Sequence, residues 1–336
     1  MEKSLDAKLR KLQLDSSCNE FILADAKDAD MAFGLAAPGR CPQTDSLRSL
    51  AEFRELIRQI VKQGLIDIAL MSASTCEVLS VEEKLFDETA ITPAVRVNDS
   101  TDIWLAAGTG NYPQQNSLPF RSANIDRLFN PNGTSIKPNG THGAGAVELG
   151  LYSITMNNDA ASDRETLEAY QNFRREAEEK GFRYFLEVFA PNSPGTNAPP
   201  DVGQFVCDTV ARTLAGLTRS ERPLFLKIPY LGPELTERLA AYDSSVILGI
   251  MGGAAGTTFE AFALLADAKK YGVRAAIFGR RINNAENQLA FVQHLRWIAD
   301  GELGAEEGVR SYHGELDRLG IRPRRSLDED LARISI

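Results

Sequence analysis

The sequence has little histidine, tryptophan and cysteine, and it has no long hydrophobic run. Its 336 residues include 3 histidines, 2 tryptophans and 4 cysteines. No run approaches about 18 apolar residues, so we expect neither a membrane span nor a membrane partner. The charged first residues lack the apolar stretch of a secretory signal, which favours a cytoplasmic protein. The scattered cysteines and histidines form no disulfide framework, zinc motif or Ser/His/Asp pattern.

Basic residues are also in the minority. The chain has 37 Lys and Arg against 46 Asp and Glu, a formal net charge of -9. A nucleic-acid binder usually shows a basic footprint, and no large Lys/Arg cluster is present, so we expect no nucleic-acid partner. An acidic protein can still bind a phosphorylated metabolite, because that needs only a local site.

Eight short apolar runs alternate with amphipathic stretches of helical periodicity. This repetition predicts a parallel sheet, and eight units fit a TIM (β/α)8 barrel better than an open doubly wound sheet. The open sheet would require a GxGxxG turn after the first strand, where the sequence reads DAKDAD. No shift in composition divides the chain, so residues 1–336 are predicted to form a single (β/α)8-barrel domain. The expected strands are 21–26, 66–71, 94–98, 146–154, 184–189, 224–229, 246–251 and 275–278, and the clearest helices are 162–180, 204–217, 233–242 and 258–271.

Segment 104–145 is too long for an ordinary strand-to-helix loop. It follows the third strand and is rich in Asn, Pro and Gly. We therefore expect a loop insertion on the C-terminal face, where barrel active sites form. It is either a surface insertion with one helix near 122–129, or a lid or subunit contact. Barrels of this size often form symmetric oligomers, so we expect a homo-oligomer.

Lys227 is the most unusual residue of the predicted strands. It follows Leu224, Phe225 and Leu226, and an unpaired buried charge is costly. Because strand residues alternate between faces, Phe225 and Lys227 would face the barrel axis, and Leu224, Leu226 and Ile228 the helices. An inward lysine is either a structural ion-pair partner or a neutral amine ready to form a Schiff base with a carbonyl.

Glu187 has the same place on the fifth predicted strand. The alternation puts Phe185 and Glu187 on one face of YFLEVF. A carboxylate beside an amine can carry protons to and from a carbinolamine. The alternative is a salt bridge to Lys227 or to Arg96.

The first strand ends in a crowd of charges: Asp25, Lys27, Asp28 and Asp30. We expect Asp25 or Asp28 to act in catalysis and Lys27 to contact substrate, but the pattern does not say which acid faces the site. A metal site is disfavoured, because no histidine is near and the spacing matches no EF-hand loop.

The third predicted strand also carries polar residues. Arg96, Asn98 and Ser100 share one face of VRVNDS. They either bind a hydroxylated substrate or complete a polar layer of the barrel.

The last two units end in glycine. Gly252 and Gly253 follow the seventh strand, and Gly279 and Arg280 follow the eighth. Backbone N–H groups in such loops bind anions, and a phosphate site at this place recurs in TIM barrels. The alternative is glycine used only for tight turns.

Together these residues resemble the class I aldolases that include the deoxyribose-phosphate, archaeal-type fructose-bisphosphate and tagatose-bisphosphate enzymes. The resemblance covers roughly residues 20–287, apart from the insertion, and is strongest over 223–281. It implies a Schiff base on Lys227, an acid/base role for Glu187 and a substrate phosphate held by the two glycine segments. It implies no metal or other cofactor. The segments that carry it are KIPYLG from Lys227, Gly252-Gly253, Gly279-Arg280, the FLE that ends at Glu187 and VRVNDST.

The chain also departs from that family. The first strand reads DAKDADMAFG in place of Asp-His-Gly or Asp-Gln-Arg. The tyrosine proton shuttle of the archaeal-type enzymes falls near Phe189 or Ala190, so its role would pass to Glu187 or Tyr230. A lysine of the tagatose branch corresponds to Glu148.

We therefore expect a class I aldolase that reversibly cleaves a carbon–carbon bond of a phosphorylated sugar or keto-sugar. The alternative is a barrel that binds a phosphorylated ligand without Schiff-base chemistry, as an isomerase or a non-catalytic sensor.

Overall fold

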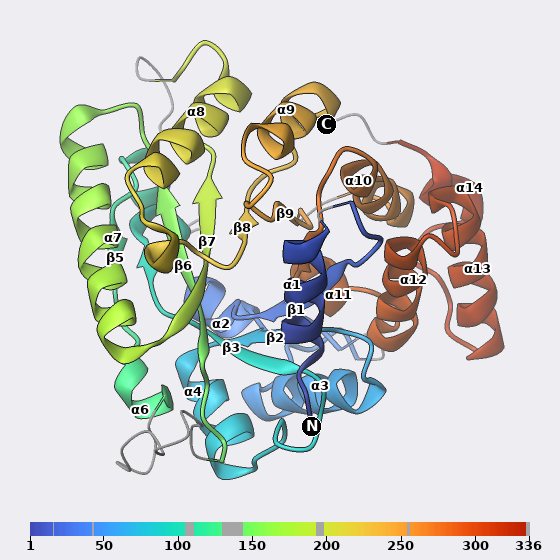
Figure 1. Cartoon of the computed structure of the whole chain (residues 1–336). Coiled ribbons are helices and arrows are strands. Elements are labelled where there is room, and N and C mark those ends of the chain that lie inside the picture. The colour runs from blue at the N-terminus through green and yellow to red at the C-terminus, as the bar shows by residue number, and fades with distance from the viewer. Residues whose placement is uncertain are drawn as a thin grey trace.

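The computed structural model describes residues 1–15, 17–41, 44–104, 111–129, 144–192, 198–253 and 256–333. Across these residues eight parallel strands form a barrel, which confirms the predicted fold (Figure 1). The strands pair in the order β8-β7-β6-β3-β2-β1-β10-β9, and a parallel bridge between Ile228 and Ile250 closes the ring. They are β1 (Ile22–Lys27), β2 (Ile68–Met71), β3 (Thr92–Arg96), β6 (Leu149–Thr155), β7 (Arg183–Phe189), β8 (Leu226–Lys227), β9 (Gly249–Met251) and β10 (Ala275–Phe278).

Helices follow the strands and cover the outside of the barrel (Figure 1). The first of the long ones, α3, starts at a capping box between Ser49 and Glu52 and ends at Gly64, whose φ is +76°. The predicted helices are present, and α13 and α14 add a further layer outside α10 and α12. The outer helices are α3 (Leu50–Gln63), α4 (Ala73–Cys76), α7 (Ala160–Lys180), α8 (Val202–Ala215), α9 (Pro233–Tyr242), α10 (Thr258–Lys270), α11 (Arg280–Asn283), α12 (Gln288–Asp300), α13 (Ala305–Arg318) and α14 (Leu327–Leu331).

The strands and the residues next to them contribute to two separate apolar clusters. Leu226 and Ile228 pack outward against the helices, and Phe225 packs inside the barrel, as the alternation predicts. The prediction was wrong for Leu224, which packs against the inner cluster. The regular strand begins only at Leu226, so alternation does not extend back to Leu224. Inside the barrel Phe185 and Phe225 stack with their ring centroids 4.6 Å apart.

The N-terminal helix α1 (Ser4–Leu14) closes the amino end of the barrel and was not predicted from the sequence. Its buried side chains Leu5, Leu9 and Leu12 belong to the inner cluster. They follow the i, i+4, i+7 spacing of one helix face. In Figure 1, α1 accordingly lies across the ring of strands.

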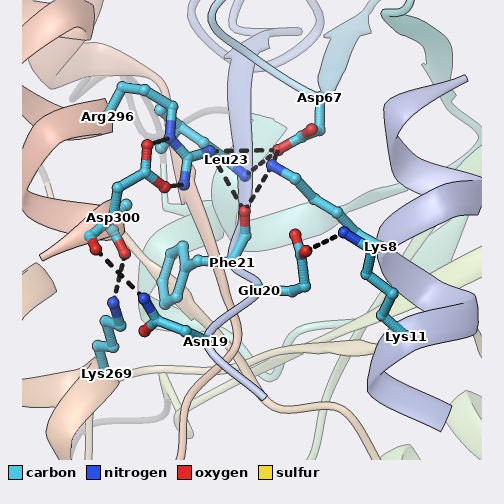
Figure 2. A network of polar contacts seen from close by, with 11 residues as sticks. Lys8, Lys11, Asn19, Glu20, Phe21, Leu23, Asp67, Lys269, Arg296 and Asp300 are labelled. Carbon is cyan, nitrogen blue, oxygen red and sulfur yellow. Dashed lines mark hydrogen bonds and ion pairs between the residues drawn. The ribbon is translucent and has the colours of Figure 1, made fainter. Parts of the chain in front are cut away.

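A buried polar network fastens α1 and α12 to the barrel. Figure 2 shows Lys8 and Arg296 reaching Asp67 from opposite sides. Asp67 Oδ2 accepts hydrogen bonds from the Leu23 N–H and from Lys8 Nζ, both at 2.8 Å, and lies 3.5 Å from Arg296 Nη1. The Phe21 carbonyl oxygen accepts from Lys8 Nζ at 2.8 Å and from Arg296 Nη1 at 3.2 Å. The carboxylate of Asp67 therefore pairs with two cations at once, of which Arg296 is also paired with Asp300.

Asp67→Ala is expected to lower the free energy of unfolding by about 3–5 kcal/mol, because it leaves these two cations without their shared carboxylate. Urea unfolding measures the change. Glu306→Ala, which removes an exposed ion pair with Arg310, is the control and is expected to cost less than about 1 kcal/mol. Equal losses in the two variants would contradict the role assigned to Asp67.

The described part of segment 104–145 does not stay on the C-terminal face. β4 (Asp99–Ser100) pairs antiparallel with β5 (Pro119–Phe120) just beyond the carboxyl end of β3. The helix expected near 122–129 is α6 (Ile125–Phe129), and it lies elsewhere. Phe129 packs edge-on against Phe182, which precedes β7 at the amino end of the barrel. The described part of the segment thus lies at both ends of the barrel and not on the C-terminal face alone, which corrects its predicted position.

His142 lies outside the described residues. Among the residues that are described, no helix has both the length and the apolar character needed to cross a bilayer.

Candidate active site

The inner apolar residues are followed, at the carboxyl ends of the strands, by a polar layer. Each of its members stands two residues beyond an inward apolar residue and so shares its face. This layer consists of Asp28, Arg96, Ser153, Glu187 and Lys227. All but Ser153 line a pocket of about 490 Å³, whose wall is completed by Phe33, Asp102, Phe189, Met251, Gly252, Gly253, Gly279 and Arg280, among others.

Lys227 and Glu187 are in direct contact in this pocket. Lys227 Nζ lies 2.5 Å from Glu187 Oε1, and the two residues are paired in register on β8 and β7. Glu187 Oε2 accepts a hydrogen bond from Ser153 Oγ at 2.6 Å. The Asn98 side chain holds the Ser153 backbone at both its N–H and its carbonyl oxygen, at 2.7 and 2.8 Å. Asn98 therefore supports the site from beneath the pocket and does not line it, contrary to the substrate contact expected from the sequence.

Arg96, on β3 and so two strands from Glu187 in the barrel, belongs to a second charged group of the pocket. Its Nη1 donates to Asp28 Oδ2 at 2.9 Å, and its Nε lies 3.0 Å from Asp99 Oδ1. Burial would lower the pKa of Arg96, but Asp28, Glu187 and Asp99 outweigh it and raise that pKa. Burial raises the pKa of Asp99 to about 6, although Arg96 opposes the shift. Arg96 is thus held cationic, and its buried Nη2 has no hydrogen-bond partner among the described residues.

Asp25 and Lys27 do not reach this pocket. The catalytic role predicted for Asp25 and the substrate contact predicted for Lys27 are therefore wrong. Ala24 and Ala26 of the same strand belong to the inner cluster, so Asp25 and Lys27 point outward, as Leu23 does. Lys27 Nζ lies 3.4 Å from Asp25 Oδ2, and both side chains are 1% exposed. Burial raises the pKa of Asp25 to about 6 and lowers the pKa of Lys27. Of the two candidate acids, only Asp28 lines the pocket.

Tyr230 is also turned away from the site. It is not among the residues that line the pocket, and its side chain packs against the outer apolar cluster. Burial and the nearby Asp267 of α10 raise its pKa. Of the two residues expected to carry the proton, Glu187 lines the pocket and contacts Lys227, and Tyr230 does not line it.

The glycines of the predicted phosphate site line the pocket, but close packing explains two of them. The Gly252 N–H donates to the Ile277 carbonyl oxygen at 3.0 Å and is engaged in the barrel. A Cβ on Gly252 would lie 2.5 Å from the Phe278 ring, and one on Gly279 would lie 2.7 Å from the Ala26 carbonyl oxygen. Gly253 differs, because its φ of +68° requires the left-handed conformation.

Arg280 is the cation at the mouth of the pocket. Its guanidinium carbon lies 5.2 Å from the centre of the Phe33 ring. Burial lowers its pKa, and no carboxylate among the described residues lies within ion-pair distance of it. A guanidinium held on an aromatic face without a counter-charge is a suitable ligand for a phosphate.

Three residues of the site escaped the sequence reasoning. Phe33 and Asp102 line the pocket, and Asp102 Oδ1 accepts a hydrogen bond from Ser117 Oγ at 2.6 Å. Ser153 stands in register with Glu187, whereas Glu148, aligned above with a family lysine, lies before β6 and 3.9 Å from Arg183. Alternation from the inner residue Leu151 would have indicated Ser153.

A buried lysine in hydrogen-bond contact with a carboxylate can exchange a proton with it and then attack a carbonyl. Within the described ranges, no group of three or more His, Cys, Asp or Glu side chains is placed to hold a metal ion. The layer itself offers an amine, carboxylates and a guanidinium group.

Neither the family models nor the curated protein sequences contain a match to the chain. Solved structures do match. An archaeal fructose 1,6-bisphosphate aldolase is 12% identical with a TM-score of 0.59, over 88% of this chain and 99% of that one. Another, solved with its catalytic lysine covalently bound to the carbinolamine intermediate of the substrate, is 13% identical with a TM-score of 0.61, over 88% and 100%. A Corynebacterium glutamicum protein is 14% identical with a TM-score of 0.57, over 89% and 94%. The chain thus has the TIM-barrel fold of the Schiff-base aldolases.

Proposed function

We propose that the protein is a class I aldolase that reversibly cleaves a phosphorylated sugar or keto-sugar through a Schiff base on Lys227. The observation that carries the proposal is the contact of 2.5 Å between Lys227 Nζ and Glu187 Oε1 inside the pocket. The similarity to structures of Schiff-base fructose-bisphosphate aldolases supports it.

The proposed reaction begins with proton transfer from the Lys227 ammonium group to Glu187. The free amine attacks the substrate carbonyl carbon and forms a carbinolamine. Glu187 returns the proton to the carbinolamine hydroxyl, water leaves, and an iminium ion remains. A base then removes a proton from the substrate hydroxyl, and the electron pair of the breaking carbon–carbon bond moves into the iminium. The aldehyde departs, the enamine is protonated, and hydrolysis frees the amine.

Two further groups would orient the substrate. Arg96 and Asp28 face the pocket together and suit the hydroxyl groups of a sugar. Arg280, which has no carboxylate partner in the part of the chain that the structure describes, suits the phosphate. This arrangement requires no metal or other cofactor.

Borohydride trapping tests the proposal. The protein is incubated with dihydroxyacetone phosphate and reduced, and the intact mass and the modified peptide are read by mass spectrometry. We expect one stable adduct, on the peptide that contains Lys227. No adduct with this ketone or with a small panel of aldehydes and keto acids would reject Schiff-base chemistry.

A further inference from the structure

We call the pocket that contains Lys227 and Glu187 the reaction pocket. A second hollow, of about 410 Å³, lies beside it and is lined by four arginines. We call it the arginine pocket. It is bounded by the start of α10, by α11 and by the segment between α13 and α14. Its lining is Gly256, Thr257, Thr258, Arg280, Arg281, Asn284, Ala285, Glu286, Phe291, Arg324 and Arg325.

The arginines are held in place mostly by groups that carry no negative charge. Arg281 Nη1 donates to the Thr257 carbonyl oxygen at 2.7 Å. Arg324 Nη1 donates to the Asn284 carbonyl oxygen, and Arg280 lies on the Phe33 ring. Among the described residues no carboxylate is within ion-pair distance of these three, and Arg325 is 3.8 Å from Asp330. Their positions are therefore set, and their charges are compensated only in part, by Asp330 beside Arg325 and by the attraction of Glu260 and Asp330 for Arg281 from beyond ion-pair distance.

The acids around the pocket also accept hydrogen bonds from neighbouring groups. Glu286 accepts hydrogen bonds from the Tyr312 hydroxyl at 3.0 Å and from the Arg324 backbone N–H at 3.1 Å. Asp330 accepts from the Thr258 N–H at 2.8 Å and lies 3.0 Å from His313 Nε2.

Glu260, which attracts Arg281 only from beyond ion-pair distance, accepts from the Thr257 N–H at 2.8 Å. These acids also occupy the first N–H groups of α10. The guanidinium groups are therefore the groups of this pocket that a ligand can bind.

We propose that the arginine pocket binds a small polyanion with at least two phosphate or carboxylate groups, at a site separate from the reaction pocket. Like charges gathered in one hollow repel each other, and in a chain of net charge -9 an anionic ligand would relieve that repulsion. Guanidinium groups bind phosphate and carboxylate in bidentate geometry. The volume falls within the range of about 300–1,000 Å³ that is typical of small-molecule sites.

The two pockets share one residue. Arg280 lines both, whereas Arg281, Arg324 and Arg325 line only the arginine pocket. Removal of Arg324 and Arg325 therefore tests the new site without touching the proposed catalytic group.

Isothermal titration with inorganic pyrophosphate at physiological ionic strength tests the proposal. One pyrophosphate is expected to bind per chain, at least about tenfold more tightly than inorganic phosphate. The double variant Arg324→Gln, Arg325→Gln is expected to weaken this binding at least about tenfold. Both side chains are exposed, so the variant should fold. Arg322→Gln, exposed but outside the lining, is the matched control and should bind as the wild type does.

Equal affinity in the double variant and the wild type, or equal affinity for phosphate and pyrophosphate, would overturn the proposal. A second measurement separates the new site from a substrate phosphate site. Lys227→Met, and wild-type protein carrying a trapped adduct, should both still bind pyrophosphate. Loss of binding in the trapped protein would make the arginine pocket part of the reaction pocket. If no adduct can be trapped, the aldolase proposal fails. The effect of Arg324→Gln, Arg325→Gln on pyrophosphate binding would still test the arginine pocket.

Discussion

Lys227→Met is expected to abolish adduct formation and to lower kcat/KM for cleavage by at least about 10⁴-fold. The thioether has no amine to attack a carbonyl, while its length is close to that of the lysine stem. The variant leaves Glu187 without its ion pair, so we expect it to be less stable than the wild type, as Lys27→Met is. It should still fold, because the apolar floor of Phe185 and Phe225 lies below the new side chain and Ser153 Oγ still donates to Glu187. Trapping with dihydroxyacetone phosphate and steady-state cleavage assays measure both effects. Adduct formation at the wild-type level would exclude Lys227 as the nucleophile.

The chain offers a matched control for this variant. Lys27 is also buried beside a carboxylate, 3.4 Å from Asp25 Oδ2, but it does not line the reaction pocket. Lys27→Met is expected to lower the free energy of unfolding by about 3–5 kcal/mol, because it leaves Asp25 unpaired. Its folded fraction should still form the adduct. Loss of the adduct in both lysine variants would point to a general structural effect.

Lys227→Arg separates the aldolase from a barrel that only binds a phosphorylated ligand. Arginine keeps the positive charge but cannot form the imine. For an aldolase this variant should be as inactive as Lys227→Met. Retained activity in a different reaction would favour the isomerase alternative.

Glu187→Gln is expected to lower kcat by about 10²–10⁴-fold with a small change in KM. The amide fits the same space and can keep a hydrogen bond from Ser153 Oγ, which donates to Glu187 at 2.6 Å. It cannot take a proton from Lys227 or return one to the carbinolamine. The rate of adduct formation and the pH profile of kcat measure the effect.

Asp25→Asn is the control for Glu187→Gln. It removes a buried carboxylate beside a lysine, as Glu187→Gln does, but outside the reaction pocket. We expect Asp25→Asn to change the free energy of unfolding and to leave the pH profile of kcat unchanged. An unaltered kcat in Glu187→Gln would move the proton route to another carboxylate of the pocket, of which Asp28 and Asp102 are the candidates.

Much of the fold and the centre of the site could be predicted from the chain alone. Eight apolar runs separated by helical stretches require a parallel sheet, and a sheet of eight such units can close on itself. The positions of Lys227 and Glu187 followed from alternation, because their strands place an aromatic residue two positions earlier, at Phe225 and Phe185. Their contact then depends only on the pairing of β7 with β8.

The first strand shows why the same reasoning failed elsewhere. All six residues of β1 are buried, so no exposed position marks which face is inside. Alternation then leaves two equivalent assignments, and only packing against the neighbouring strands decides between them. That packing turns Asp28 into the pocket and Asp25 and Lys27 away from it. Tyr230 lies beyond its strand, where alternation no longer applies.

The sequence by itself determined the barrel, the inward lysine and carboxylate, and the glycine-lined ends of the last two strands, because these depend on local periodicity. The tertiary structure decided which first-strand acid meets Arg96, how α1 closes the barrel, and where the described part of segment 104–145 lies. It also brought Arg280 and Arg281 together with Arg324 and Arg325 in one pocket. These features join residues far apart in the chain, and their contacts depend on how helices and loops pack around the closed sheet.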